Sequence, residues 1–226
     1  MLSRILGHIG QEISWVHTLI KEELASKKKY LGVFADLIIY PVNMNIRPAL
    51  VILSSRIFGN VSEKTLLLAS VFQYIYLATT IQQCVYSYDI SDSSQGVAAG
   101  PGSKLPVLAG DYLYGRALTL LSKEGLQNYI QPIARIVRNI HEGCIIKHML
   151  KHKLSSHMTL IEATQKEYAE LFGGCCSQGA GVAGASLAEQ EMLKCYGQNF
   201  GMAYGLLEAG MKSEYVEPYL QVAREA

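Results

Sequence analysis

The longest hydrophobic pattern in the chain runs over residues 66–89. Apolar side chains recur there at steps of three and four residues, which is the period of an α-helix. An unbroken helix over this range would contain about 24 residues and be roughly 35 Å long. Glutamines and tyrosines interrupt the pattern, and it has no purely apolar run of about 18 residues of the kind that spans a membrane. The pattern therefore predicts the central helix of a large helical core.

The rest of the chain is also typical of helices, and no β-alternation of useful length is present. A polar, glycine-rich crossing leads to a second apolar helix over 105–121. Gly59 is placed to end a preceding helix, and Ser62 to cap the long one. Further helices are predicted at the N-terminus and over 30–40, 47–58, 128–149, 159–171, 173–187, 188–207 and 213–224. The expected fold is all-α, with one domain over 1–226 and no repeat.

Composition excludes several classes of protein. A net charge of +1 and a pI near 7.6 give no argument for binding nucleic acid or an anionic membrane. Half of the residues are hydrophobic, which fits a large core or an additional apolar surface for a partner subunit or a lipid tail. Five cysteines without a CxxC pair argue against disulfides and zinc, and the histidines lack metal-ligand spacing. Without a signal-peptide pattern, we expect a cytoplasmic protein with no transmembrane segment.

Four stretches carry a resemblance to a known family. They are NIRPALVIL (45–53), VLAGDYLYGRAL (107–118), PIARIVRNIHEG (132–143) and the small-residue region 171–207. Together they resemble the trans-polyprenyl diphosphate synthases, over nearly the whole chain. The resemblance implies an isoprenoid-synthase-type helical bundle around a deep isoprenoid cavity. It also implies the condensation of an allylic diphosphate with isopentenyl diphosphate.

The resemblance fails at the acidic motifs. Members of the family bind Mg²⁺ through two DDxxD-type motifs, because magnesium prefers hard oxygen ligands. The six corresponding acidic positions are Gln83, Cys84, Ser87, Glu208, Ala209 and Lys212. The chain contains four aspartates in all, which are too few for two such motifs. We therefore assign no catalytic residue and no bound cofactor to this chain.

The family's diphosphate site is kept in part. Its GGKRxRP motif corresponds to 42–48, where Arg47 is retained while the lysine and the first arginine are lost. Arg47 could hold a diphosphate, or it could have a structural or interface role. The family's lysine–threonine pair falls on Glu167 and Tyr168, with Lys166 one residue away.

Other residues are open to a chemical and a structural interpretation. Asp89 and Asp92 form either a metal-binding pair three residues apart or a polar turn that ends a helix. Asp111 of the LAGDY segment fixes a buried turn or a helix pairing, or else takes part in chemistry. With Leu108 and Tyr112 it is a candidate for the subunit interface.

Four residues before the lost first motif occupy the family's tunnel-lining positions. They shape a cavity for a growing prenyl chain, or they are ordinary core residues. The four are Tyr74, Ile75, Ala78 and Thr79.

The lost motifs and an expected C-terminal shortening resemble one group in particular, the small subunit (component I) of two-component heptaprenyl and hexaprenyl diphosphate synthases. The resemblance implies a heterodimer whose large subunit is catalytic, supplies both motifs and binds Mg²⁺, and whose product is the side-chain precursor of menaquinone. A homodimer could form if the chain is expressed alone. Helices 66–89 and 105–121 are expected to form the core and much of the interface.

Two other functions remain open. One is an autonomous prenyltransferase with unusual metal ligation by Asp89, Asp92 and Glu208. The other is an isoprenoid-binding scaffold without enzymatic role.

Overall fold

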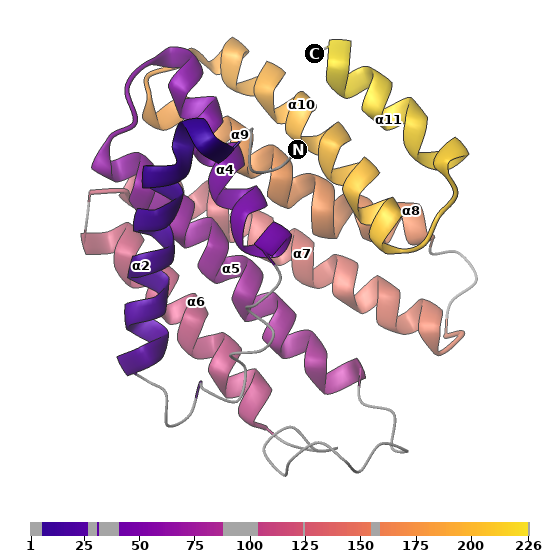
Figure 1. The fold of residues 1–226 in the computed structure, drawn as a ribbon. Coiled ribbons are helices and arrows are strands. Elements are labelled where there is room, and N and C mark those ends of the chain that lie inside the picture. The colour runs from indigo at the N-terminus through magenta and orange to yellow at the C-terminus, as the bar shows by residue number, and fades with distance from the viewer. Residues whose placement is uncertain are drawn as a thin grey trace.

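A computed structural model of the chain describes residues 6–26, 31, 41–87, 104–123, 125–154 and 159–225. For residues 26, 41–42 and 84–87 it describes the backbone alone. Within the described ranges every regular element is helical and none is a strand (Figure 1). The predicted all-α class is confirmed.

The described elements follow one another along the chain in this order. They are the 3₁₀ turn η1 (Gly7–Ile9), α2 (Gly10–Ser26), α4 (Pro41–Phe58), α5 (Glu63–Ser87), α6 (Leu105–Lys123), the 3₁₀ turn η4 (Gln127–Tyr129), α7 (Ile130–Lys151), α8 (Leu160–Thr164), the π-helical turn η5 (Gln165–Ala169), α9 (Glu170–Val182), α10 (Leu187–Glu208) and α11 (Ser213–Glu225). The π turn joins α8 to α9, so that the two helices predicted over 159–171 and 173–187 are one continuous rod ending at Val182.

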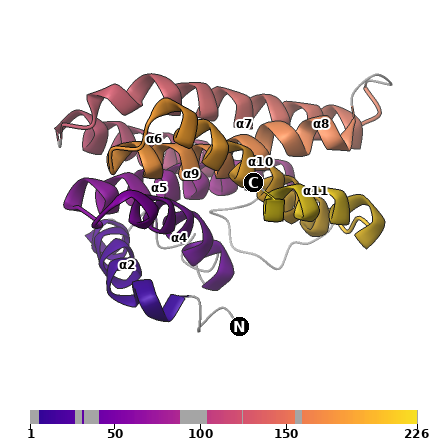
Figure 2. The ribbon, with the colours of Figure 1, turned by 90° about the horizontal axis from the view of Figure 1, so that it is seen from above.

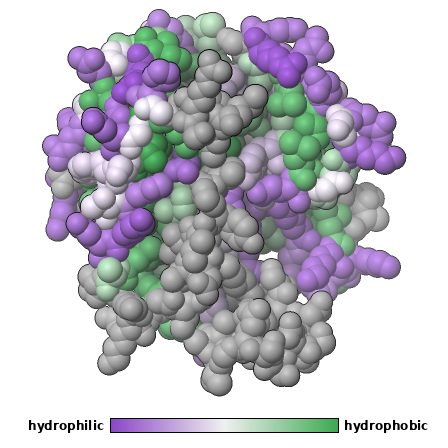
Figure 3. Space-filling view, viewed as in Figure 1, coloured by the Kyte–Doolittle hydropathy of each residue, from purple (hydrophilic) through white to green (hydrophobic). Residues whose placement is uncertain are grey.

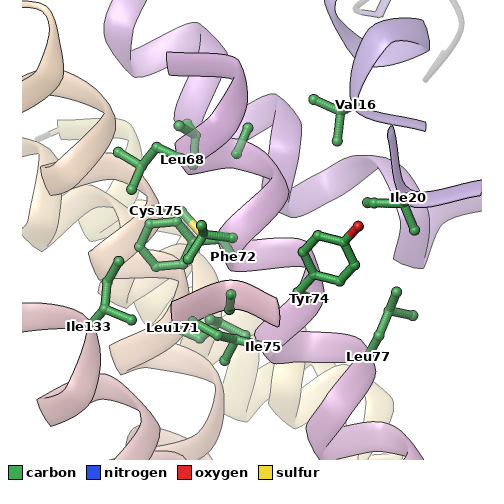
Figure 4. Packing of buried hydrophobic residues seen from close by; sticks show 14 of the residues in the cluster. Val16, Ile20, Leu68, Phe72, Tyr74, Ile75, Leu77, Ile133, Leu171 and Cys175 are labelled. Carbon is green, nitrogen blue, oxygen red and sulfur yellow. The ribbon is translucent and has the colours of Figure 1, made fainter. Parts of the chain in front are cut away.

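Helix α5 is the centre of the bundle, as predicted. It packs against α2, α4, α6, α7 and α9, and in the view from above it lies with α9 between the α6–α7 side and the α2–α4 side (Figure 2). Tyr74 and Leu77 point toward Val16 and Ile20 on one side, while Phe72 packs beside Cys175 on the other (Figure 4). The core is therefore built around both sides of this helix.

One described helix, residues 63–83 of α5, is long and apolar enough to cross a membrane, and 78% of its apolar window is buried inside the fold. This is typical of a core helix. The face seen in Figure 3 is a mosaic of polar and apolar described residues without a continuous apolar belt.

Capping residues behave as the sequence predicts at α5. The Ser62 hydroxyl accepts a hydrogen bond from the Thr65 backbone N–H at 3.3 Å, which satisfies a donor of the first turn. Helix α4 ends at Phe58, next to Gly59, also as expected.

The start of α4 was predicted wrongly. We expected a helix over 47–58 with Pro48 in its first turn, but α4 begins at Pro41 and Pro48 lies inside it. A proline at this position cannot donate to the Met44 carbonyl one turn earlier. His17 Nε2 lies 3.4 Å from that carbonyl and can satisfy it, which makes the interior proline tolerable. The helix predicted over 30–40 lies almost wholly outside the described residues.

Glycines bring the backbones of α9, α10 and α4 together. A Cβ added to Gly201 would lie 2.6 Å from the Tyr168 carbonyl oxygen, and one added to Gly179 would lie 2.5 Å from the Val51 carbonyl oxygen. Neither distance is compatible with a side chain, so the small-residue segment packs closely, as predicted. This packing fixes η5 and α10 against each other beside the end of α5.

Candidate functional site

Two neighbouring cavities lie near the C-terminal end of α5. The polar cavity has a volume of about 190 Å³ and is lined by Asn43, Arg47, Tyr76, Thr79, Thr80, Gln83, Ile140, Glu167, Tyr168, Leu171 and Glu208. The apolar cavity has a volume of about 400 Å³ and is lined by Thr79, Gln82, Gln83, Val107, His141, Cys144, Ile145 and His148. Thr79 and Gln83 belong to both linings, so these two side chains lie between the cavities.

Arg47 is a buried cation at the polar cavity, with 1% of its surface exposed. Its guanidinium stacks on the Tyr76 ring at 3.5 Å from the centroid, and Nη1 donates to the Asn43 carbonyl at 3.2 Å. Nε has no hydrogen-bond partner, and no described carboxylate forms an ion pair with this arginine. The site therefore offers unused donors to an anion. Burial within the chain prevents direct contact with a partner subunit.

Glu208 is held by two tyrosines. The Tyr168 hydroxyl donates to Oε2 at 2.8 Å. The Tyr204 hydroxyl lies 2.7 Å from Oε1 and 2.8 Å from Asn43 Oδ1, between two acceptors. Burial, together with the hydrogen bonds to this carboxylate, raises the pKa of both phenols, so both stay protonated donors at neutral pH.

Glu167 is the second carboxylate of the polar cavity. Gln83 Nε2 donates to its Oε1 at 2.8 Å, and Lys147 of α7 forms an ion pair with its Oε2. Gln83 Nε2 also lies 3.0 Å from the Cys144 sulfur. This cluster of Gln83, Glu167, Lys147 and Cys144 joins α5, α7 and η5 at the position where the resemblance places the first metal-binding aspartate.

The π turn η5 presents Glu167 and Tyr168 together to the polar cavity. Such turns add one residue to a helix and redirect its side chains. Lys166 points elsewhere and donates to Glu142 at 2.7 Å, which lowers the pKa of that carboxyl. The cation beside Glu167 is thus Lys147 of α7.

The four predicted tunnel residues have different environments. Thr79 lines both cavities, and its hydroxyl is 2.6 Å from the Tyr114 hydroxyl. Tyr74, Ile75 and Ala78 are at most 1% exposed and belong to the main core cluster. The apolar cavity continues from Thr79 toward α7.

The LAGDY segment lies inside α6, and no turn is present there. Asp111 is exposed and accepts a hydrogen bond from Gln82 Nε2 at 2.9 Å, while a Cβ on Gly110 would lie 2.4 Å from the Gln82 side chain. The expected buried turn is therefore wrong, and the Gln82–Asp111 hydrogen bond joins α5 to α6. Leu108 and Tyr112 project outward, with 62% and 36% of their surfaces exposed.

The apolar cavity is lined by neutral groups of α7. Burial lowers the pKa of His141, against the opposing charge of Asp111, which favours the uncharged imidazole. Burial likewise raises the pKa of the Cys144 thiol to about 11, so it is not a reactive thiolate. An apolar ligand would meet no fixed charge on these two side chains.

The polar cavity does not fit a magnesium ion. Mg²⁺ requires hard oxygen ligands that are free to coordinate. All four carboxylate oxygens of Glu167 and Glu208 lie against a protein donor, and one donor is an ammonium group. No group of three or more histidine, cysteine or acidic side chains that could hold a metal occurs in the described part of the chain. Asp89 and Asp92 fall outside it.

Solved structures identify the class of the fold. The chain superimposes with a TM-score of 0.77 on a polyprenyl synthase from Caulobacter crescentus, at 24% identity, over 92% of this chain and 64% of that one. A deletion mutant of a mint heterotetrameric geranyl pyrophosphate synthase is similar over 97% of this chain and 91% of that one, with a TM-score of 0.69 and 13% identity. The fold is that of the isoprenyl diphosphate synthases.

The chain belongs to the polyprenyl synthetase family, whose sequence profile matches residues 30–208. The octaprenyl diphosphate synthase of Escherichia coli (strain K12) is 25% identical over 92% of this chain. A probable hexaprenyl pyrophosphate synthase of Neurospora crassa is 30% identical over 62% of it. The chain spans 65% of the length of the E. coli relative and 33% of the Neurospora one.

Proposed function

We propose that this chain is a non-catalytic subunit of a heterodimeric trans-polyprenyl diphosphate synthase in the cytoplasm. Its partner is a catalytic chain of the same family that supplies both aspartate-rich motifs and the Mg²⁺ needed to ionise the allylic substrate. The present chain supports that activity and helps to set product length. The product is the precursor of the menaquinone side chain.

The contacts of Gln83 carry this proposal. An aspartate at this position would present oxygens to a magnesium ion, whereas the Gln83 amide presents N–H donors to Glu167 and Cys144. The Lys147 ammonium group adds a positive charge beside Glu167. Donors and a cation repel a second cation, so these contacts oppose metal binding at this helix end. The E. coli and Neurospora relatives are named as octaprenyl and hexaprenyl diphosphate synthases, which supports the proposed substrate class.

The outer face of α6 is the proposed partner surface. Leu108 and Leu118 are 62% and 51% exposed, and a Cβ on Gly115 would have no neighbour within 4 Å. Asp111, the acidic residue of this helix, is already hydrogen-bonded to Gln82. A low-charge apolar stripe with a gap at a glycine suits close packing of another helix. The heterotetrameric assembly of the mint relative is consistent with such a contact.

The described side chains of α5 leave little surface for a partner. Apart from its first turn they are buried or half-buried in this chain. We therefore assign the core to α5 and the interface to α6.

The test is prenyl transfer from labelled isopentenyl diphosphate with Mg²⁺ and an allylic primer. It compares this chain, the co-encoded catalytic chain, and their mixture. We expect full activity in the mixture alone, with a defined product length. No increase in the mixture over the partner would contradict the subunit role and favour a scaffold.

Two matched variants locate the interface. Leu108→Asp is expected to reduce the activity of the mixture at least tenfold at limiting partner, because it places a charge in an apolar contact. Leu187→Asp is the control, since Leu187 is 83% exposed and lies at the start of α10. Equal effects of the two variants would exclude α6 as the interface.

A further inference from the structure

Among the described side chains, Thr79 and Gln83 of α5 line both cavities and lie at the boundary between them. Thr79 is fixed there, because its hydroxyl lies 3.0 Å from the Ile75 carbonyl and 2.6 Å from the Tyr114 hydroxyl. Gln83 is the other side chain, one turn later on the same face of the helix. Its position decides whether the polar and the apolar cavity are separate.

Contacts on both sides hold Gln83 across this boundary. Its Nε2 donates to Glu167, which lines the polar cavity, and approaches the sulfur of Cys144, which lines the apolar cavity. A glutamine amide has two N–H donors, so both contacts can form together. The side chain is thereby tied between α7 and η5.

This arrangement can open without leaving a buried charge unpaired. Gln83 is half-buried, and a thiol is a weak hydrogen-bond acceptor. When the amide moves away, Glu167 keeps its ion pair with Lys147. The cost of opening is therefore confined to the hydrogen bonds of one neutral side chain.

The two cavities differ in the ligand group that each would accept. Arg47 offers unused donors in the polar cavity, while Val107, Ile145 and neutral His141 line the apolar one. An amphiphile with an anionic head and an apolar chain matches both, provided that the boundary is open.

We propose that Gln83 is a gate between the two cavities, and that its position determines whether one prenyl diphosphate can occupy both. With the gate closed, the polar cavity holds the anionic head and the chain is excluded from the apolar cavity. With the gate open, the same molecule extends past Thr79 toward α7. This inference rests on the proposed function for the class of ligand.

The experiment measures binding to the whole chain by titration calorimetry in EDTA. The probes are inorganic pyrophosphate, which is the head alone, and farnesyl thiodiphosphate, which is an unreactive head with a chain. For each chain, the gain from the prenyl chain is the ratio of the Kd of pyrophosphate to the Kd of farnesyl thiodiphosphate. The variants are Gln83→Ala, Gln83→Met, which keeps the volume without the N–H donors, and the control Gln221→Ala. Gln221 is exposed on α11 and lines neither cavity.

For the unmodified chain and for Gln221→Ala we expect the prenyl chain to raise the affinity less than threefold. Gln83→Ala is expected to gain about tenfold, because no hydrogen bond has to be broken on entry, and Gln83→Met at least threefold. The Kd of pyrophosphate itself should agree within twofold among the unmodified chain and the three variants.

The gate is excluded if the affinity that the prenyl chain adds in Gln83→Ala and in Gln83→Met lies within twofold of the value for the unmodified chain. It is also excluded by an equal gain in Gln221→Ala, or by a failure of pyrophosphate to bind. None of these results depends on a catalytic partner. The proposed subunit role fails separately, through an unchanged rate in the mixture.

Discussion

The glycine seam between α9 and α10 and the C-terminal end of α5 are neighbouring regions built on different kinds of contact. In the seam, Gly197 and Gly201 allow backbone contact, with added Cβ atoms only 2.6 Å from carbonyl oxygens of the facing helix rod. At the end of α5, an amide that binds Glu167 occupies the proposed metal position. The residues that maintain this fold and those that would perform its chemistry are therefore separable.

The strongest test of the seam is Gly201→Ala. The new Cβ would meet the Tyr168 carbonyl and Ala169 backbone, neither of which can rotate away. We expect the free energy of unfolding to fall by about 2–3 kcal/mol, measured by urea denaturation. Gly115→Ala is the control, since its Cβ has no neighbour within 4 Å, and it should stabilise α6 by up to about 1 kcal/mol. Equal destabilisation by both would contradict the packing role.

At the end of α5, Lys147→Met tests how much the ion pair with Glu167 stabilises the fold. It leaves a nearly buried carboxylate with one donor, Gln83. Lys147 is one-third exposed, so we expect a moderate loss of about 1–2 kcal/mol in the free energy of unfolding. The added change Glu167→Gln should restore most of it. If the double variant is no more stable than Lys147→Met alone, the lost stability comes from packing of the lysine stem and not from the unpaired carboxylate.

Arg47→Met separates stability from anion binding. The change loses the stacking on Tyr76 but also removes a buried cation without a carboxylate partner. These effects oppose each other, so unfolding should change by less than about 1.5 kcal/mol. Pyrophosphate binding should weaken at least tenfold by calorimetry. A loss of stability above about 3 kcal/mol with unchanged binding would make Arg47 purely structural.

The smallest expected effect is a pH dependence of the free energy of unfolding, which arises from one histidine in the N-terminal helix and one at the apolar cavity. Burial lowers the pKa of His17 and of His141 below 6.5 in the folded chain. The unfolded chain then binds more protons as the pH falls below 6.5, so the free energy of unfolding should decrease there. Urea titrations at pH 7.5 and 5.5 measure this slope, and His141→Asn should reduce it. A slope unchanged by that variant would assign the effect to other groups.

Local signals predicted much of the fold. The helical period found α5, Ser62 marked its cap, and the small residues of 173–187 indicated close packing, because each feature depends on neighbours in sequence. The start of α4 was missed because His17, 27 residues away, approaches the carbonyl that Pro48 leaves without its helical donor. No local rule anticipates that contact.

The site was less predictable. Arg47 and Thr79 could be located by resemblance, and both line the polar cavity. Lys147 could not be paired with Glu167, because the register of α7 against the π turn η5 is set by tertiary packing. The contacts of Tyr168 and Tyr204 with Glu208 depend in the same way on the glycine seam.

Under the proposed function this chain keeps the fold of its family but cannot ionise an allylic diphosphate by itself. The most direct measurement is release of pyrophosphate from labelled farnesyl diphosphate by the purified chain with Mg²⁺, followed over many turnovers. We expect no release above the buffer rate, with or without isopentenyl diphosphate. Mg²⁺-dependent release that disappears in Glu208→Gln would contradict it and establish an autonomous enzyme.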